Sequence, residues 1–133
     1  MKLTTKSEYT LLALIHLARH QERGYIKIEE ICEQCDIPKK YLELLLSTLR
    51  QARYVKTRRG STGGYMLARP AAEITLAEII RLMDGALAPT ESVSKYFFSD
   101  TPLAKEKKII AVLAEIRDYI AARLERLTLA DVA

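Results

Sequence analysis

The amino-acid sequence predicts a mainly α-helical protein with a small β wing: a winged helix-turn-helix followed by a long C-terminal dimerisation helix. Three observations support this fold class. Two segments with helical spacing of apolar residues flank a turn at residues 36–38. Two strand-like segments after them enclose the glycine-rich loop 59–64. Apolar residues then recur in steps of three and four along residues 102–127, as on a helix that packs along another helix.

The first predicted helix covers residues 6–20, with Thr4 or Thr5 as its N-cap. Its buried stripe is expected to contain Leu11, Leu14, Ile15 and Ala18. His16 and His20 would lie on the opposite face. Gly24 ends this segment, and a short second helix follows, with an inner stripe of Ile28, Ile31, Cys32 and Cys35.

The third predicted helix covers residues 39–52, and Pro38 suits its first position. Its buried residues are expected to be Leu42, Leu45, Leu46 and Leu49. Residues 54–57 and 65–68 then form a hairpin, because they are rich in aromatic and β-branched residues and are joined by a loop with three glycines. Tyr65 is expected to pack the wing against the body.

Thr75 caps a predicted fourth helix that ends at Gly85 and faces inward through Leu76, Ile79, Ile80 and Met83. Residues 86–101 are an irregular connector, and residues 102–127 form the last helix. At about 1.5 Å per residue that helix would extend roughly 37 Å, too far for the small body to cover. The sequence therefore predicts a homodimer whose interface contains Ile109, Leu113, Ile116, Ile120 and Leu124.

These elements divide the chain into three parts: a winged helix-turn-helix domain (1–85), the connector (86–101), and a dimerisation helix with a short docking tail (102–133). The aromatic run 96–98 in the connector would either pack the dimer arm or form one wall of an effector pocket.

Positive charge is concentrated in the helix-turn-helix and the wing. Eight basic residues and one acidic residue lie between Lys39 and Arg69, so this segment carries +7 while the whole chain carries +4. The remainder therefore carries −3. A basic patch on a mildly acidic body is typical of a protein that binds a polyanion, and the fold indicates double-stranded DNA.

Candidate DNA-binding residues come from three places. The third helix would present Lys39, Lys40, Tyr41, Glu43, Ser47 and Arg50 to the major groove. From the wing, Arg59 would enter a minor groove, Lys56 and Arg58 would contact phosphates, and Gly60 and Gly63 would allow close approach. Near the N-terminus, Lys2, Thr4 and Tyr9 would reach the DNA backbone, unless this end is frayed.

Other functional classes find little support. No apolar run is long enough to cross a membrane and no export signal is present, so the cytoplasm is the expected compartment. The sequence contains neither a P-loop nor a Ser/His/Asp set, so no enzyme is expected. Cys32 and Cys35, with His16 and His20, imitate a zinc signature, but the cysteines fall on the buried stripe of their helix, so no metal is expected.

The chain also resembles the Rrf2 family of bacterial winged-helix regulators. The resemblance rests on residues 1–9 (MKLTTKSEY), residues 41–45 (YLELL) and the wing motif Arg59-Gly60-x-x-Gly63-Gly64-Tyr65-x-Leu67, and it extends to residues 128–131 (TLAD). It implies a homodimer that binds operator DNA, with an inverted-repeat operator. Cluster-bearing members have three cysteines in the connector. Residues 86–101 contain neither Cys nor His, so no cofactor is expected.

The leading prediction is thus a sequence-specific transcriptional regulator, a dimeric repressor without an iron–sulfur cluster, whose protein or small-molecule effector is unknown. Two alternatives remain open. One is a protein-interaction module derived from such a regulator, in which the long helix binds a partner helix. The other is a metal- or thiol-dependent sensor that uses the Cys and His pairs.

Overall fold

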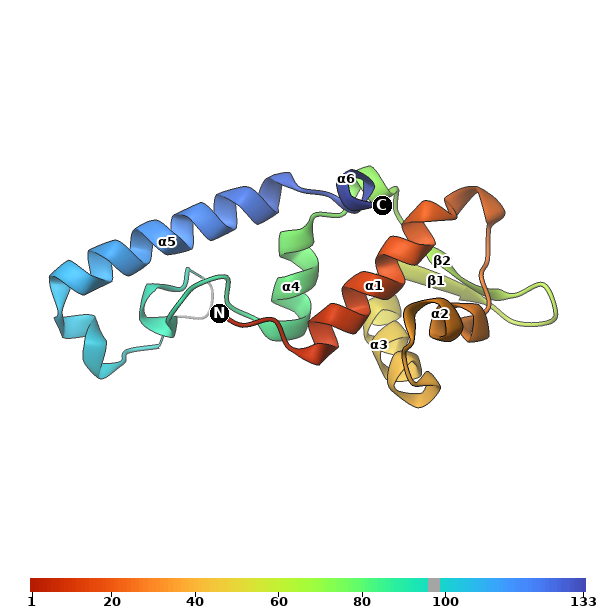
Figure 1. Ribbon diagram of the computed structural model, residues 1–133, viewed down its shortest axis with the longest axis horizontal. Coiled ribbons are helices and arrows are strands. Elements are labelled where there is room, and N and C mark those ends of the chain that lie inside the picture. The colour runs from red at the N-terminus through yellow and green to blue at the C-terminus, as the bar shows by residue number, and fades with distance from the viewer. Residues whose placement is uncertain (96–98) are drawn as a thin grey trace.

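The computed structural model describes residues 1–95 and 99–133 (Figure 1). One end of the elongated molecule contains the helices α1 (Thr5–Arg19), α2 (Ile28–Cys35), α3 (Lys39–Gln51) and α4 (Leu76–Asp84) and the strands β1 (Val55–Arg58) and β2 (Gly64–Leu67). The strands pair antiparallel, with Val55 opposite Leu67 and Arg58 opposite Gly64. Helix α5 (Lys107–Arg126) extends to the other end, and the short α6 (Leu129–Val132) lies back at the first. The described chain is mainly helical with a two-stranded wing, as predicted.

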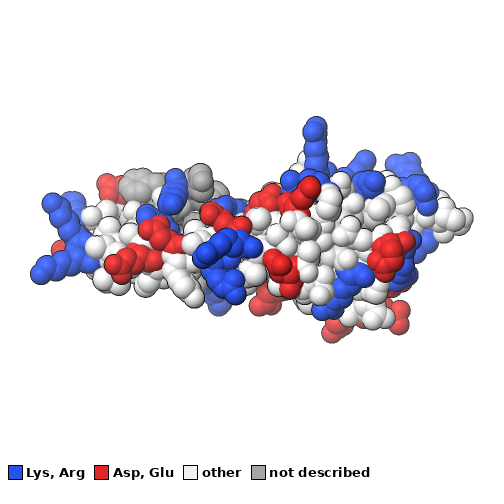
Figure 2. Space-filling model, turned by 90° about the horizontal axis from the view of Figure 1, so that it is seen from above, with Lys and Arg blue, Asp and Glu red and all other residues white. Residues whose placement is uncertain are grey.

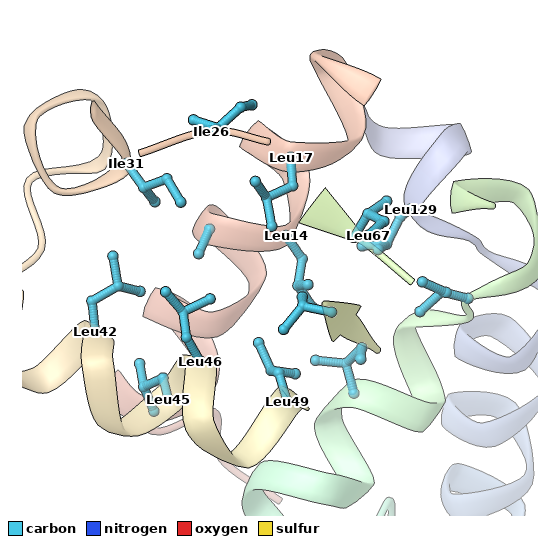
Figure 3. Close-up of a cluster of buried hydrophobic side chains, with 14 of the residues drawn as sticks. Leu14, Leu17, Ile26, Ile31, Leu42, Leu45, Leu46, Leu49, Leu67 and Leu129 are labelled. Carbon is cyan, nitrogen blue, oxygen red and sulfur yellow. The ribbon is translucent and has the colours of Figure 1, made fainter. Parts of the chain in front are cut away.

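The core forms where α3 packs against α1 and α2. All four leucines predicted for the inner face of α3 are buried, and Leu42, Leu46 and Leu49 have no exposed surface. Figure 3 shows them facing Leu14 and Leu17 from α1 and Ile31 from α2. Burial of each such side chain contributes about 1.5–3 kcal/mol, so this cluster fixes the angle at which α3 is presented.

Helix α1 begins as predicted, because the Thr4 hydroxyl accepts a hydrogen bond from the Ser7 amide. Its buried face is rotated from the predicted one. Ala13, Leu14 and Leu17 are buried, whereas Leu11, Ile15 and Ala18 are only partly buried. The prediction that His16 lies opposite the core was also wrong, since it is 8% exposed.

Burial of His16 is possible because other segments supply its polar partners. Its Nε2 lies 2.8 Å from Oε2 of Glu30 on α2, and Glu30 also accepts hydrogen bonds of 2.9 and 2.7 Å from Arg23. A buried polar group that is hydrogen-bonded no longer carries the full desolvation penalty. This cluster ties the end of α1 to the helix-turn-helix.

A pH-dependent contribution to stability follows from this cluster. The hydrogen bonds from Arg23 and then His16 lower the pKa of Glu30 from 4.5 to about 2. A lowered carboxyl pKa stabilises the fold above the unfolded value, and that contribution is lost as the pH falls from about 4.5 toward 2. Glu30→Gln should therefore cost roughly 1–2 kcal/mol at neutral pH and flatten the acid side of the stability profile, measured by thermal melts. The exposed Glu33→Gln is the control, and parallel profiles for Glu30→Gln and wild type would contradict the assignment.

Helix α5 is shorter than predicted. Residues Pro102–Lys105 form a separate 3-10 turn, and Glu106, with φ −90° and ψ 86°, leaves helical geometry before α5 begins. The helix has 20 residues, or about 30 Å. Its inner face packs on α4, where Ile120 and Leu124 contact a small cluster of Ala77, Ile80 and Leu87. Arg81 of α4 and Glu125 of α5 are 2.6 Å apart in an ion pair.

The C-terminal tail rejoins the first end of the molecule. Thr75 and Thr128 form an isolated antiparallel bridge, in which the Leu76 amide donates to the Leu127 carbonyl and the Leu129 amide to the Ile74 carbonyl, each at 2.9 Å. Leu129 is fully buried in the main core, close to Leu67 in Figure 3. The predicted docking tail therefore completes the core of the N-terminal part of the chain.

Candidate nucleic-acid interface

The outer face of α3 is exposed along its length. Opposite the buried leucines lie Lys40, Glu43, Leu44 and Ser47, and Arg50 is exposed to one side of them. Leu44 is 68% exposed. A mixed basic, polar and apolar face of this kind can contact base edges, including a thymine methyl group.

Two predicted residues at the start of α3 are engaged within the protein. Lys39 Nζ lies 3.3 Å from Oε1 of Glu29, with both side chains largely exposed. Tyr41 packs edge-to-face on Tyr9 of α1, with ring centroids 5.6 Å apart. Although Tyr9 and Tyr41 were predicted from different segments, the structure brings them together.

Thr4 has a structural role that the prediction did not include. Besides capping α1, its hydroxyl and its backbone amide both donate to the carboxylate of Asp84 at the end of α4. Its hydroxyl is therefore engaged within the protein, and its contact to DNA stays a prediction. Lys2 lies nearby, exposed at the edge of a pocket of about 280 Å³ that Met1 and Asp84 also line.

The wing tip presents Arg59 to solvent. Lys56 on β1 is also exposed and lies opposite Met66. The Gly63 amide donates to the Gly60 carbonyl at 3.0 Å and closes the tip, where Gly60 has a φ of +100°. A Cβ on Gly63 would lie 2.0 Å from the Arg58 carbonyl oxygen, so only glycine fits this turn.

The exposed side chain of Arg58 makes two contacts within the protein, and its predicted contact to a phosphate stays a prediction. Its guanidinium lies 4.4 Å from the ring centroid of Tyr25 and donates to the Thr62 carbonyl at 2.8 Å. A cation–π contact together with a hydrogen bond holds the side chain back along the loop. Arg58 thus helps to hold the loop of the wing in shape.

A short segment before α2 supports the wing and was not predicted from the sequence. Ile26 and Tyr65 form an isolated antiparallel bridge with two 2.8 Å hydrogen bonds, so this segment is tied to β2 of the wing. Lys27 Nζ also donates to the Gly60 carbonyl at 3.0 Å. The aromatic and β-branched pair Tyr25-Ile26 is the only sequence signal, and it is too short to distinguish from a loop. As predicted, Tyr65 packs against the core.

A basic groove lies where the end of α3 meets the outer side of the wing. It has a volume of about 550 Å³ and is lined by Arg50, Arg53, Val55, Lys56, Thr57, Ala68 and Arg69. Four of these seven residues are basic and none is acidic. Figure 2 shows Lys and Arg side chains gathered along one edge of the molecule near the wing.

The cysteines and histidines do not assemble into a metal site. Cys32 and Cys35 are partly buried on α2, burial raises the pKa of both thiols, and the Cys35 thiol donates to the Leu12 carbonyl. His16 is committed to Glu30. In the two described ranges, 1–95 and 99–133, no three His, Cys, Asp or Glu side chains are placed to hold a metal ion.

The residues predicted for the dimer interface lie on two different faces of helix α5. Ile120 and Leu124 contact α4 of the same chain, and Leu113 is partly buried. On another face of the helix, four large apolar residues are exposed: Ile109, Val112, Ile116 and Tyr119, with exposed fractions of 41, 50, 43 and 72%. We call these four residues the outer stripe of α5. Of the residues predicted for the dimer interface, Ile109 and Ile116 belong to this outer stripe.

Two remaining expectations concern the connector and membranes. The aromatic run 96–98 falls outside the described residues. Among the helices that are described, none combines the length and the apolarity needed to span a bilayer.

Comparison with known proteins gives consistent matches over the whole chain. The Rrf2 family model, described as an iron-dependent transcriptional regulator, matches residues 3–133. A putative HTH-type transcriptional regulator of Synechocystis sp. is 36% identical over 132 residues, covering 99% of this chain and 87% of that protein. The HTH-type transcriptional regulator CymR of Bacillus subtilis is 35% identical over 133 residues, covering 100% and 90% of the two chains.

Solved structures agree with these matches. The structure of CymR, the global cysteine regulator of B. subtilis, superposes with a TM-score of 0.79 at 33% identity, covering 100% of this chain and 96% of that one. The IscR structure of T. potens gives a TM-score of 0.76 at 32% identity and covers 99% and 85%. Both comparisons include the wing and the long C-terminal helix, since nearly all of this chain is aligned.

Proposed function

Because the chain belongs to the Rrf2 family of DNA-binding transcriptional regulators, which are not enzymes, we propose that it acts as a homodimeric repressor on an inverted-repeat operator. The observation that carries this proposal is the pair of exposed elements α3 and wing, which present Lys40, Arg50 and Arg59 on a rigid core. A repressor of this kind acts in the cytoplasm, where it occupies promoter DNA.

In the proposed complex the N-terminal half of α3 lies in the major groove. Lys40 and Ser47 would contact bases or phosphates, and Glu43 would accept from a cytosine amino group. Arg59 would enter the adjacent minor groove, where a narrow groove concentrates negative potential. The wing would approach in a fixed shape because Lys27 and Arg58 donate hydrogen bonds to carbonyl groups of its loop.

The family description mentions iron, but the residues of this chain do not fit an iron–sulfur cluster at the family's position. Residues 86–101 contain no Cys or His. Both cysteines lie on α2 instead, where burial raises the thiol pKa and thus disfavours the thiolate that would bind iron. We therefore propose a cluster-free regulator whose signal is a protein or a small molecule. Cluster absorption in anaerobically purified protein would overturn this proposal.

Arg59→Ala should weaken binding to a selected operator by about 1–3 kcal/mol, because the minor-groove contact is lost. Lys56→Ala should mainly lower the dependence of log K on log salt by about one, because one phosphate contact is lost. Fluorescence anisotropy over a salt series measures both. Lys107→Ala, at the start of α5, removes one positive charge far from the wing and is the control. Unchanged operator affinity for a folded Arg59→Ala protein would contradict the proposed interface.

The alternative functions have weaker support. A thiol sensor requires a reactive thiolate, and both thiols have raised pKa values. A protein-interaction module would use the outer stripe of α5 but would not need exposed cations on α3 and the wing. Selection of DNA fragments by the purified protein separates these functions, because an interaction module would enrich no sequence.

A further inference from the structure

The basic groove contains cations that the contacts to the major and minor grooves do not use. Arg53 and Arg69 line it together with Arg50 and Lys56. No ion pair among the described residues engages Arg50, Arg53 or Lys56, so three positive charges face one groove without a counter-ion from the protein. A groove with this charge favours an anionic ligand.

Arg69 is held rigidly in the groove wall. Its guanidinium donates to Oε1 of Glu78 at 3.0 Å and lies 4.7 Å from the centroid of the Tyr54 ring, and the Tyr54 hydroxyl also donates to Glu78. The Arg69 Nε is buried and has no partner in the protein. One side of the groove is therefore preorganised, while the other side carries exposed cations.

Arg53 occupies an unfavourable backbone position. Its φ is +66°, a region where glycine is comfortable and other L-residues are strained. The turn is fixed because the Arg53 amide donates to the Arg50 carbonyl and the Tyr54 amide to the Leu49 carbonyl. A glycine at this position would relieve strain, so a stability argument alone does not account for an arginine side chain here.

We propose that this groove binds phosphates of the DNA that flanks each half-site, an inference that rests on the proposed function. Arg50 belongs to both the groove and the exposed face of α3, and Lys56 to both the groove and the wing, so the surface is continuous with the proposed interface. The groove lies at the C-terminal end of α3, whereas bases are contacted from the N-terminal half of a recognition helix. Its cations therefore meet the backbone beyond the base pairs that are read, where they add affinity without sequence preference.

The test compares two duplexes that contain the same selected operator, one trimmed to the operator and one extended by about ten base pairs on each side. For wild type, the extended duplex should bind about tenfold more tightly and show a steeper salt dependence. Arg53→Gly should lose most of this advantage, while binding to the trimmed duplex stays within about twofold and the melting temperature is equal or higher. Arg53→Lys keeps the charge and should retain the advantage.

The outcomes distinguish failure of the groove proposal from failure of the proposed function. If wild type binds no selected duplex, the proposed function itself is wrong. If wild type binds both lengths equally, or if Arg53→Gly keeps the full advantage, only the groove proposal is overturned. If Arg53→Gly leaves both DNA affinities unchanged but abolishes binding of a poly-glutamate peptide that wild type binds, the groove recognises acidic protein instead.

Discussion

Replacing Ile116 and Tyr119 with glutamate should convert the protein to monomers and abolish tight binding to an inverted-repeat operator. Both side chains are exposed in the single chain, at 43 and 72%, so the subunit itself should fold normally. In a dimer formed through the outer stripe of α5, the same substitutions bury unpaired charge, at a cost of several kcal/mol per subunit pair. Sedimentation velocity at micromolar concentration measures the change in mass.

A matched control lies on the same helix. Ala111 and Ala122 are exposed and, at 100° per residue, lie on a different face from the outer stripe. Ala111→Glu with Ala122→Glu adds the same two charges and should leave the dimer intact. Each Ile116/Tyr119 variant monomer keeps one recognition helix and one wing, so weak salt-dependent binding to any duplex should survive. A wild-type protein that sediments as a monomer, or a stripe variant that still binds the palindrome tightly, would refute the proposed interface.

Gly64→Ala should cost about 2–4 kcal/mol and detach the wing from the body. The backbone at Gly64 has a φ of +143°, and a Cβ there would lie 2.3 Å from the Ile26 carbonyl oxygen, which is main chain and has little room to move. The bridge between Ile26 and Tyr65 must therefore open. Thermal unfolding reports the lost stability, and operator affinity should fall as strongly as in Arg59→Ala because the wing is no longer positioned.

Gly24→Ala separates backbone strain from steric clash. Gly24 also has a positive φ, +77°, but a Cβ on this residue would meet no other atom within 4 Å. Its substitution should cost only the strain, about 1–3 kcal/mol, and leave operator binding unchanged. Equal destabilisation by the two variants would mean that the close approach of Gly64 to Ile26 does not matter.

Elements with a strong local signal could be predicted from the sequence. The leucine stripe of α3, the threonine caps of α1 and α4, and the glycine turn of the wing each depend on neighbouring residues in the chain. Helical spacing and capping are local properties, and these predictions were confirmed.

Features that depend on distant partners could not be predicted. The spacing along α5 shows that an apolar face exists, but not that Ile120 and Leu124 are covered by α4 of the same chain. Burial of His16 requires Glu30 and Arg23, and the orientation of Arg58 requires Tyr25. The same holds for the candidate site. Its exposed cations could be identified from the sequence, whereas the side chains that hold the wing in shape could not.

The return of the tail to the core has a consequence for how the protein folds during synthesis. Leu129 fills a fully buried position among side chains from α1 and β2, so the hydrophobic core stays open until residue 129 has left the ribosome. Domains made of sequential elements can fold as they emerge from the ribosome. Here the nascent segment α1–α4 would expose the apolar side chains that Leu129 covers in the complete chain. Truncation before residue 128 should therefore yield an aggregation-prone chain rather than an autonomous DNA-binding fragment, and we expect newly made protein to become active only after α5 and the tail have been synthesised.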